Sequence, residues 1–260
     1  MVKSWNFQKT DYALITGASS GIGEAYANRF ASLGCSLVLV ARNITKLNDV
    51  ASDIKKSYGV QVEVIDADLS DDSDVKRVEE SINQNENIVA LINCAGFALR
   101  KHFIEQDLNK QLSMIQLHIL TSTHLTHAAI PKMIKNNRGI IINVSSLLSL
   151  MTLNNNVVHC ATKAYLNRFS QNLAMELCDK NIKVQALNPG YTITNFHSTE
   201  EFKGVKKNYP KLFTMTTDEL VDKSIDALKK RRVIVVPGIA NQMLVRLKFL
   251  FAPIVMKSMG

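Results

Sequence analysis

Cysteine is scarce in this chain, and none of its cysteines lie close together. The four positions, Cys35, Cys94, Cys160 and Cys178, contain no C-x-x-C pair in 260 residues. This spacing argues against a disulfide framework and against a zinc site. Four further histidines show no ligand spacing with Cys or carboxylates: His102, His124, His127 and His197. We therefore expect no metal and interpret the cysteines as reduced thiols in or near the core.

Long apolar runs, repeats and low-complexity tracts are also lacking. No run approaches the roughly 20 apolar residues that a membrane-spanning helix needs. The segment 1–17 has no long apolar core and no small-residue cleavage site, so export is not expected. The sequence favours a soluble, cytoplasmic protein with a single domain over residues 1–260.

Acidic residues are fewer than basic ones: 23 Asp and Glu stand against 31 Lys and Arg, which gives a net charge of +8. An excess of positive charge is typical of proteins that bind nucleic acid or an anionic membrane. The basic residues are scattered, however, and the short runs 206–207 and 229–232 form no recognisable nucleic-acid motif. We interpret the charge as a solvated basic surface and expect no nucleic-acid partner.

What the chain does have is a regular alternation of apolar strands and helices. Seven strands are predicted, over 12–16, 36–41, 62–66, 88–93, 139–144, 182–188 and 233–237. One long helix is expected over 107–136, and others over 44–58, 72–84, 157–179 and 217–230. Strands separated by such helices pair in parallel through right-handed crossovers. The prediction is an α/β protein with a three-layer, doubly wound parallel sheet of about seven strands, Rossmann-like in architecture.

A glycine turn joins the first strand to the first helix. The segment TGASSGIG, residues 16–23, has the spacing G-x-x-x-G-x-G, with glycines at 17, 21 and 23. Glycine permits a tight turn and close backbone approach, so that a pyrophosphate can rest on the helix N-terminus. In a first βα turn, this pattern indicates a dinucleotide site.

Six segments, in order, carry a resemblance that covers essentially the whole chain: TGASSGIG, DADL (66–69), NCAG (93–96), NVSS (143–146), Lys163 with its helix, and NPG (188–190). With them the chain resembles the short-chain dehydrogenase/reductase family. The resemblance implies cofactor contacts from the following residues: Gly17, Ser19, Ser20, Gly21, Ile22, Gly23, Asp68, Leu69, Asn93, Ala95, Gly96, Lys163, Pro189, Gly190, Thr192 and Thr194. Asp68 and Leu69 would contact adenine, and 189–194 the nicotinamide side. It also implies a homo-oligomer, a dimer or tetramer, formed through helices 107–136 and 157–179.

The residue after the second strand bears on which dinucleotide binds. Arg42 stands where an NAD-preferring protein usually places a carboxylate against the ribose hydroxyls. A guanidinium favours a 2′-phosphate instead. Arg42, helped by Ser19 and with Lys46 adding charge, therefore predicts NADP(H) as the cofactor.

The catalytic positions depart from the family pattern, which uses a Tyr for proton transfer, a Lys four residues later, a Ser and an Asn. Ser146 and Lys163 are retained, but His159 occupies the Tyr position and His118 the Asn position. These four residues are the candidate catalytic set. Cys94 replaces a frequent second Asn and is interpreted as structural. Because the Lys163 ammonium disfavours a second cation nearby, His159 should be neutral, a usable base but a poor acid.

Three functions are compatible with this pattern. The first is an NADP(H)-binding oxidoreductase acting on an apolar carbonyl or alcohol, with alcohol oxidation favoured over carbonyl reduction. The second is a catalytically impaired nucleotide-binding protein that serves as a sensor, scaffold or partner subunit. The third is a repurposed, non-redox enzyme that uses Ser146 and His159, with Ser146 as nucleophile.

Two further regions bear on the substrate side. Residues 190–216 occupy the family's substrate-lid region and are rich in aromatic and aliphatic residues, which suits either an apolar substrate or a loop packing its own side chains. The amphipathic extension 238–260 could rest on an anionic membrane. We favour a role in covering the pocket or a subunit interface, because Pro253 limits any one helix to about three turns.

Overall fold

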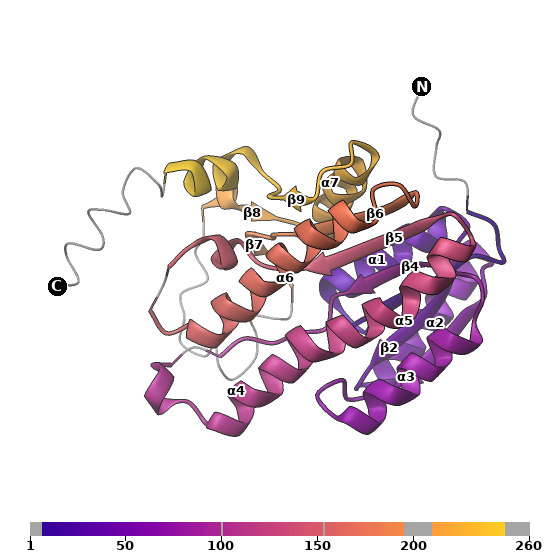
Figure 1. Cartoon of the computed structure of the whole chain (residues 1–260), viewed down its shortest axis with the longest axis horizontal. Coiled ribbons are helices and arrows are strands. Elements are labelled where there is room, and N and C mark those ends of the chain that lie inside the picture. The colour runs from indigo at the N-terminus through magenta and orange to yellow at the C-terminus, as the bar shows by residue number, and fades with distance from the viewer. Residues whose placement is uncertain (1–6, 100, 153, 195–209, 248–260) are drawn as a thin grey trace.

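Seven parallel strands form the centre of the protein (Figure 1). The computed structural model describes residues 7–99, 101–152, 154–194 and 210–247. The strands are β1 (Tyr12–Thr16), β2 (Ser36–Ala41), β3 (Val62–Asp66), β4 (Ile88–Asn93), β5 (Gly139–Val144), β6 (Ile182–Leu187) and β9 (Ile234–Val235). Their order in the sheet is β3-β2-β1-β4-β5-β6-β9. The predicted doubly wound, Rossmann-like sheet is confirmed.

Helices cover both faces of this sheet. They are α1 (Gly21–Ser32), α2 (Ile44–Tyr58), α3 (Asp72–Gln84), α4 (Leu108–Ile115), α5 (Ser122–Lys135), α6 (Val157–Glu176) and α7 (Thr217–Lys229). Residues of α1, α2 and α7 join one buried cluster, and residues of α3, α5 and α6 join the other. Because both faces are covered, β1, β2, β4, β5 and β6 are apolar almost throughout, as buried parallel strands require.

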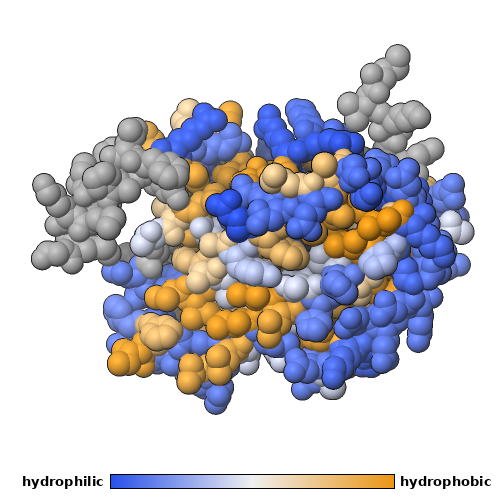
Figure 2. Space-filling model, viewed as in Figure 1, coloured by the Kyte–Doolittle hydropathy of each residue, from blue (hydrophilic) through white to orange (hydrophobic). Residues whose placement is uncertain are grey.

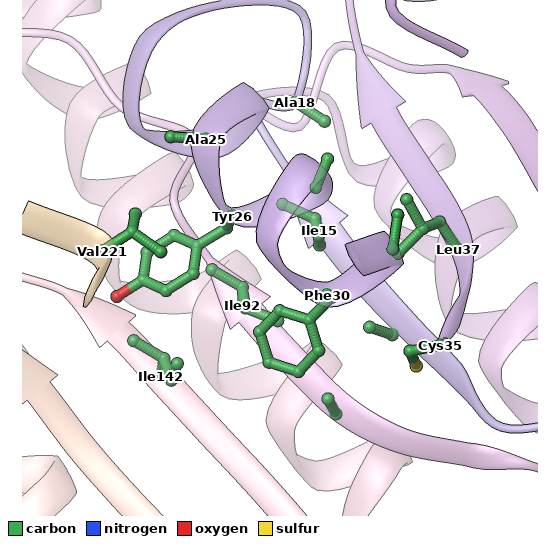
Figure 3. Close-up of a cluster of buried hydrophobic side chains, with 14 of the residues drawn as sticks. Ile15, Ala18, Ala25, Tyr26, Phe30, Cys35, Leu37, Ile92, Ile142 and Val221 are labelled. Carbon is green, nitrogen blue, oxygen red and sulfur yellow. The ribbon is translucent and has the colours of Figure 1, made fainter. Parts of the chain in front are cut away.

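The core beneath α1 is built around two aromatic side chains (Figure 3). Tyr26 and Phe30 are fully buried, and they point toward Ile92 and Ile142 of the sheet. The hydroxyl of Tyr26 lies 2.6 Å from that of Ser224 on α7, so that its polar end is satisfied. These contacts fix the position of α1 relative to the sheet, and with it the position of the glycine turn at the carboxyl ends of the strands.

The long helix expected over 107–136 is not regular. Between α4 and α5 the backbone forms a π-helical segment, Gln116–Thr121. Thr121 and His118 are buried there, and their side chains bond to other elements: Thr121 Oγ1 donates to the carbonyl of Leu69 at 2.7 Å. Apolar periodicity does not reveal such polar contacts, so the sequence predicted one uniform helix, and that prediction is wrong in this segment.

A small second sheet was also not predicted. Strand β7 (Tyr191–Thr192) pairs in parallel with β8 (Thr214–Met215), which ties together the two ends of the expected lid region 190–216. Residues 195–209 of that region, and 248–260 of the C-terminal extension, lie outside the described part of the chain. Residues 239–247 form a helix. Among the helices that are described, none combines the length and the apolarity that crossing a bilayer requires.

Candidate active site

The glycine turn at the carboxyl end of β1 is shaped for close approach. Gly17 has φ +68°, a left-handed conformation, and a Cβ there would lie 2.9 Å from the Cα of Ala95. A Cβ on Gly23 would lie 2.2 Å from the carbonyl oxygen of Gly17. Ser20 is the N-cap of α1, and its side chain makes no capping hydrogen bond. The first amides of α1 are therefore left for an anion, which fits a dinucleotide pyrophosphate.

Arg42 lies at the same edge, directly after β2. Its side chain is largely exposed, and its Nη1 lies 3.5 Å from the Oδ2 of Asp68, which follows β3. Burial acts to raise the pKa of Asp68, but hydrogen bonds from Ser70 and the charge of Arg42 outweigh it and hold that pKa below its usual value. The guanidinium and the carboxylate thus face each other where the resemblance places the adenosine half of the cofactor.

Hydrogen bonds with hydroxyl and amide side chains fix the end of β4 and the segment that follows it, which begins with Cys94. Thr16 Oγ1 accepts hydrogen bonds from the amides of Cys94 at 2.9 Å and Ala95 at 3.0 Å. The buried Asn93 donates from Nδ2 to Oδ1 of Asn143 at 2.8 Å. Burial raises the pKa of Cys94 to about 12, so this thiol is a poor nucleophile, in keeping with a structural role.

Lys163 is buried behind this segment. Its Nζ donates to the carbonyl of Val144, at the end of β5, at a distance of 2.8 Å. The backbone carbonyl of Lys163 in turn accepts from the hydroxyl of Ser145 at 2.7 Å. Burial of the ammonium lowers the pKa of Lys163 to about 8. The lysine is held rigidly, and its charge titrates close to physiological pH.

His159 lies one helical turn before Lys163 and is almost fully buried. Burial, followed by the charge of Lys163, lowers the pKa of His159 to about 4, and a hydrogen bond to the backbone of Phe97 opposes this only in part. Nδ1 is buried without a hydrogen-bond partner in the described part of the chain. The ring is therefore neutral near pH 7. The hydrogen bond to Phe97 is assigned to Nε2–H because Nδ1 has no partner, which leaves a buried lone pair on Nδ1.

His118 is stacked edge-on against His159, with the ring centroids 5.9 Å apart. The hydroxyl of Thr162 donates to the carbonyl of His159 at 3.1 Å, so it accepts from His118 Nδ1–H at 2.9 Å. This leaves a lone pair on Nε2, which is buried with no hydrogen-bond partner among the described residues. Burial, Lys163 and His159, in that order, hold the pKa of His118 well below its usual value.

Gly96 marks the point where these groups converge. A Cβ at this position would lie 2.8 Å from Nε2 of His118 and 3.4 Å from Nζ of Lys163. The imidazole lone pair and the ammonium therefore reach the same small volume at the carboxyl edge of the sheet, next to the glycine turn. Any side chain at 96 would fill that volume.

An open depression with room for about one water molecule adjoins His159. Its lining mixes apolar and polar side chains, among them Leu99, Phe103, Met114, Lys101, Gln111 and Asn156. Ser146 N-caps the short 3₁₀ turn Leu147–Leu150, and its hydroxyl accepts from the amide of Leu148 at 3.1 Å. Over the glycine turn, a Cβ on Gly21 would lie 3.2 Å from the methyl group of Thr194.

The structure thus brings together three of the candidate catalytic residues, His118, His159 and Lys163, and the fourth, Ser146, follows β5 at the same sheet edge. Two residues that position them were missed: Thr162 and Phe97. Phe97 directly follows NCAG, which was a usable signal, whereas nothing in the sequence singles out Thr162. No group of three possible metal ligands occurs in the residues that the structure covers.

Comparison with known proteins supplies the family. A family model described as short chain dehydrogenase matches residues 11–203. The chain belongs to the short-chain dehydrogenase family. Proteins of this family are oxidoreductases that act on alcohol and carbonyl groups. The family match and the fold agree with the motifs from which the resemblance was inferred.

Individual relatives add detail to this assignment. The chain is 34% identical over 188 residues to a very-long-chain 3-oxoacyl-CoA reductase of Anas platyrhynchos, covering 70% of this chain and 60% of that protein. It is 31% identical over 193 residues to a human protein named inactive hydroxysteroid dehydrogenase-like protein 1, covering 74% and 58%. The chain therefore spans about 60% of the length of these relatives. A solved structure of a short-chain dehydrogenase from Sphingobium yanoikuyae in complex with NADPH has a TM-score of 0.82 and 32% identity, covering 96% of this chain and 94% of that one.

Proposed function

We propose that the protein is an NADP(H)-dependent oxidoreductase that interconverts an apolar alcohol and its carbonyl compound. The observation that carries this proposal is the placement of the Lys163 ammonium beside Gly96, at the sheet edge that also holds the glycine turn. A nicotinamide cofactor supplies hydride transfer when bound. The protein's own task is to hold that cofactor, orient the substrate oxygen and move one proton.

Residues on both sides of the sheet's centre would hold the cofactor. The uncapped start of α1 would bind the pyrophosphate, and Lys163 the nicotinamide ribose. Arg42 would bind a 2′-phosphate, and support comes from its place at this edge, where its guanidinium pairs with the Asp68 carboxylate. The NADPH complex of the related dehydrogenase supports the same choice.

The proton would move at His159 in this proposal. The ring is neutral and its N–H is hydrogen-bonded to the backbone of Phe97. Nδ1, which carries the lone pair, is therefore the atom that would take a proton from a substrate hydroxyl. A neutral imidazole with a pKa of about 4 is a weak base at pH 7, and hardly any of it is protonated to act as an acid. We therefore expect kcat for alcohol oxidation to exceed kcat for carbonyl reduction, while the ratio of the two kcat/KM values is set by the overall equilibrium.

A second candidate function is nucleotide binding without turnover. It is favoured by the same two histidines, whose lowered pKa values leave neither imidazole protonated to act as an acid near pH 7. A relative named inactive agrees with this alternative. A non-redox reaction of Ser146 has less support, because its hydroxyl already accepts the Leu148 amide, and the described contacts include no base bonded to it.

Titration with NADPH and NADH tests the cofactor proposal. Loss of a charge-assisted hydrogen bond weakens binding by about 10- to 100-fold. Arg42→Ala should therefore lower the affinity for NADPH by that factor and the affinity for NADH by much less. Lys55→Ala, which removes an exposed cation from the far end of α2, is the matched control and should change neither. Dissociation constants follow from nucleotide fluorescence. An equal loss of affinity for both nucleotides would contradict the role given to Arg42.

A panel of carbonyl compounds and alcohols, assayed with the bound nucleotide, then separates turnover from binding alone.

We also infer that the protein is a homo-oligomer. Exposed apolar side chains follow α4 and the π segment, at Leu108, Leu112 and Leu120, and Figure 2 shows hydrophobic residues gathered over α4. Exposed apolar side chains gathered in this way are typical of a subunit interface. Light scattering at micromolar concentration should give a dimer or tetramer mass, and Leu112→Glu should shift it toward the monomer. A monomeric native protein would contradict this inference.

A further inference from the structure

Nearly all of the net positive charge lies in the last part of the chain. No Asp or Glu follows Asp226, whereas seven of the 31 Lys and Arg do. The chain up to Asp226 therefore carries 24 cations against all 23 carboxylates and is close to neutral. The Lys and Arg residues are scattered along the chain, but their excess over Asp and Glu lies almost wholly in one segment, 227–260.

The described helix of this segment, residues 239–247, exposes an apolar face. Ile239, Met243 and Leu247 recur every four residues and are 73%, 57% and 46% exposed. This spacing places them on one side of the helix. Leu244 and Arg246 are exposed as well. An apolar stripe with a cation beside it is thus presented to the surroundings rather than to the core.

The opposite side of this helix is fixed to the domain. Asn241 is 3% exposed and donates from Nδ2 to the carbonyl of Pro237 at 3.0 Å. Gln242 donates from Nε2 to the carbonyl of Val236 at 2.8 Å. A Cβ on Gly190 would lie 2.5 Å from Nδ2 of Asn241, so the helix sits directly on the NPG turn. The apolar stripe therefore has a defined orientation and does not cover the depression beside His159.

A basic cluster shares the same edge of the molecule. Lys230, Arg231 and Arg232 are exposed and stand just before β9, while the helix of 239–247 follows just after it. Strand β9 is the outermost strand of the sheet on this side. In Figure 1 the end of α7, β9 and this helix lie along the upper side of the view. Cations and apolar side chains thus flank one exposed edge.

We propose that this edge binds the surface of an anionic lipid bilayer. The stripe of Ile239, Met243 and Leu247 would enter the headgroup region, and the basic cluster would pair with lipid phosphates. Nucleic acid would leave the apolar stripe unused. A second copy docked by two-fold symmetry would bring two segments of the same positive charge together. The proposal concerns location and does not depend on the catalytic proposal.

Co-sedimentation of the full chain with vesicles tests the proposal. The protein should bind vesicles containing phosphatidylserine, bind pure phosphatidylcholine only weakly, and lose most binding in about 1 M salt, where the screening length is about 3 Å. Met243→Glu should weaken vesicle binding more than about tenfold, because a carboxylate would replace an apolar side chain that the bound bilayer would bury. Arg231→Gln with Arg232→Gln should weaken it about 25-fold, at about fivefold per cation. Met175→Glu, at an exposed methionine on α6 that lies outside this edge, is the control: Met175 is 76% exposed and Met243 57%.

Each other outcome would overturn the proposal. Absence of binding, or equal binding to both kinds of vesicle, would show that anionic lipid is not the partner. Sensitivity to the arginine changes but not to Met243→Glu would indicate nonspecific charge attraction. A change of oligomeric mass in Met243→Glu, without an effect on vesicle binding, would assign the stripe to a second copy. Unchanged thermal unfolding of each variant shows that the result is not a folding defect.

Discussion

Replacing His159 with tyrosine is expected to raise the rate of NADPH-dependent carbonyl reduction by about 10²- to 10⁴-fold, the range that a positioned general acid contributes. The native ring cannot supply this acid, because its pKa of about 4 keeps it neutral and its N–H is bonded to Phe97. A phenol keeps its proton at neutral pH. The ammonium of Lys163, one helical turn away, would lower the phenol's pKa toward the working range.

The native protein should in contrast favour alcohol oxidation. Initial rates in both directions, with the same substrate pair and saturating nucleotide, measure the balance for the native chain and for His159→Tyr. His159 is among the residues that line the open depression, so the phenol would lie at its edge. His124→Tyr, an exposed histidine on α5 paired with Glu79, is the matched control and should leave both rates unchanged.

Native reduction that equals or exceeds that of His159→Tyr would show that the imidazole is an effective acid. If neither protein turns over while both bind NADPH, the nucleotide-binding alternative is the better description. Unaltered NADPH affinity in the variant is required for either conclusion. The two outcomes separate a weakened enzyme from a binding protein.

The sheet was predictable because its signals are local. Continuous apolar segments such as 36–41 and 88–93, each followed by a helix, leave few alternatives to parallel strands covered on both faces. The glycine turn was equally clear, since the left-handed conformation at position 17 favours glycine, and that glycine can be read directly from the sequence. The short pair β7 and β8 was missed, because two residues per strand carry no period that can be recognised.

The residues of the candidate site could be proposed from the sequence, whereas their electrostatics could not. His118 and His159 could be assigned by their place in the motifs, and a neutral His159 followed from the nearby Lys163. The tautomer of His118 could not be assigned, because it depends on Thr162, whose hydroxyl meets the ring only after α6 packs against the π segment. Burial, the largest cause of all three lowered pKa values at His118, His159 and Lys163, is a property of the assembled fold.

The buried His159 should also make the protein acid-labile. Its pKa is about 4 when folded and about 6.5 in its ordinary state, so between these values the unfolded chain binds a proton that the folded chain does not. The free energy of unfolding therefore falls as the pH drops from 6.5 to 4, and the part due to this ring is about 3 kcal/mol at about 1.4 kcal/mol per pH unit. Above pH 6.5 this part is fully present.

Urea unfolding at several pH values between 4 and 7, with the native chain and His159→Phe, isolates the contribution. Phenylalanine does not titrate, so the stability of the variant should depend less steeply on pH, and the two slopes should differ by up to about 1.4 kcal/mol per unit. The carboxylates act in both proteins and cancel in the difference. The pKa of His118 is lowered partly by His159 and should be lowered less in the variant, which flattens the pH dependence of the variant in the same sense. Parallel curves throughout this range would mean that His159 is not held neutral by the fold, and the argument for its weakness as an acid would fail with it.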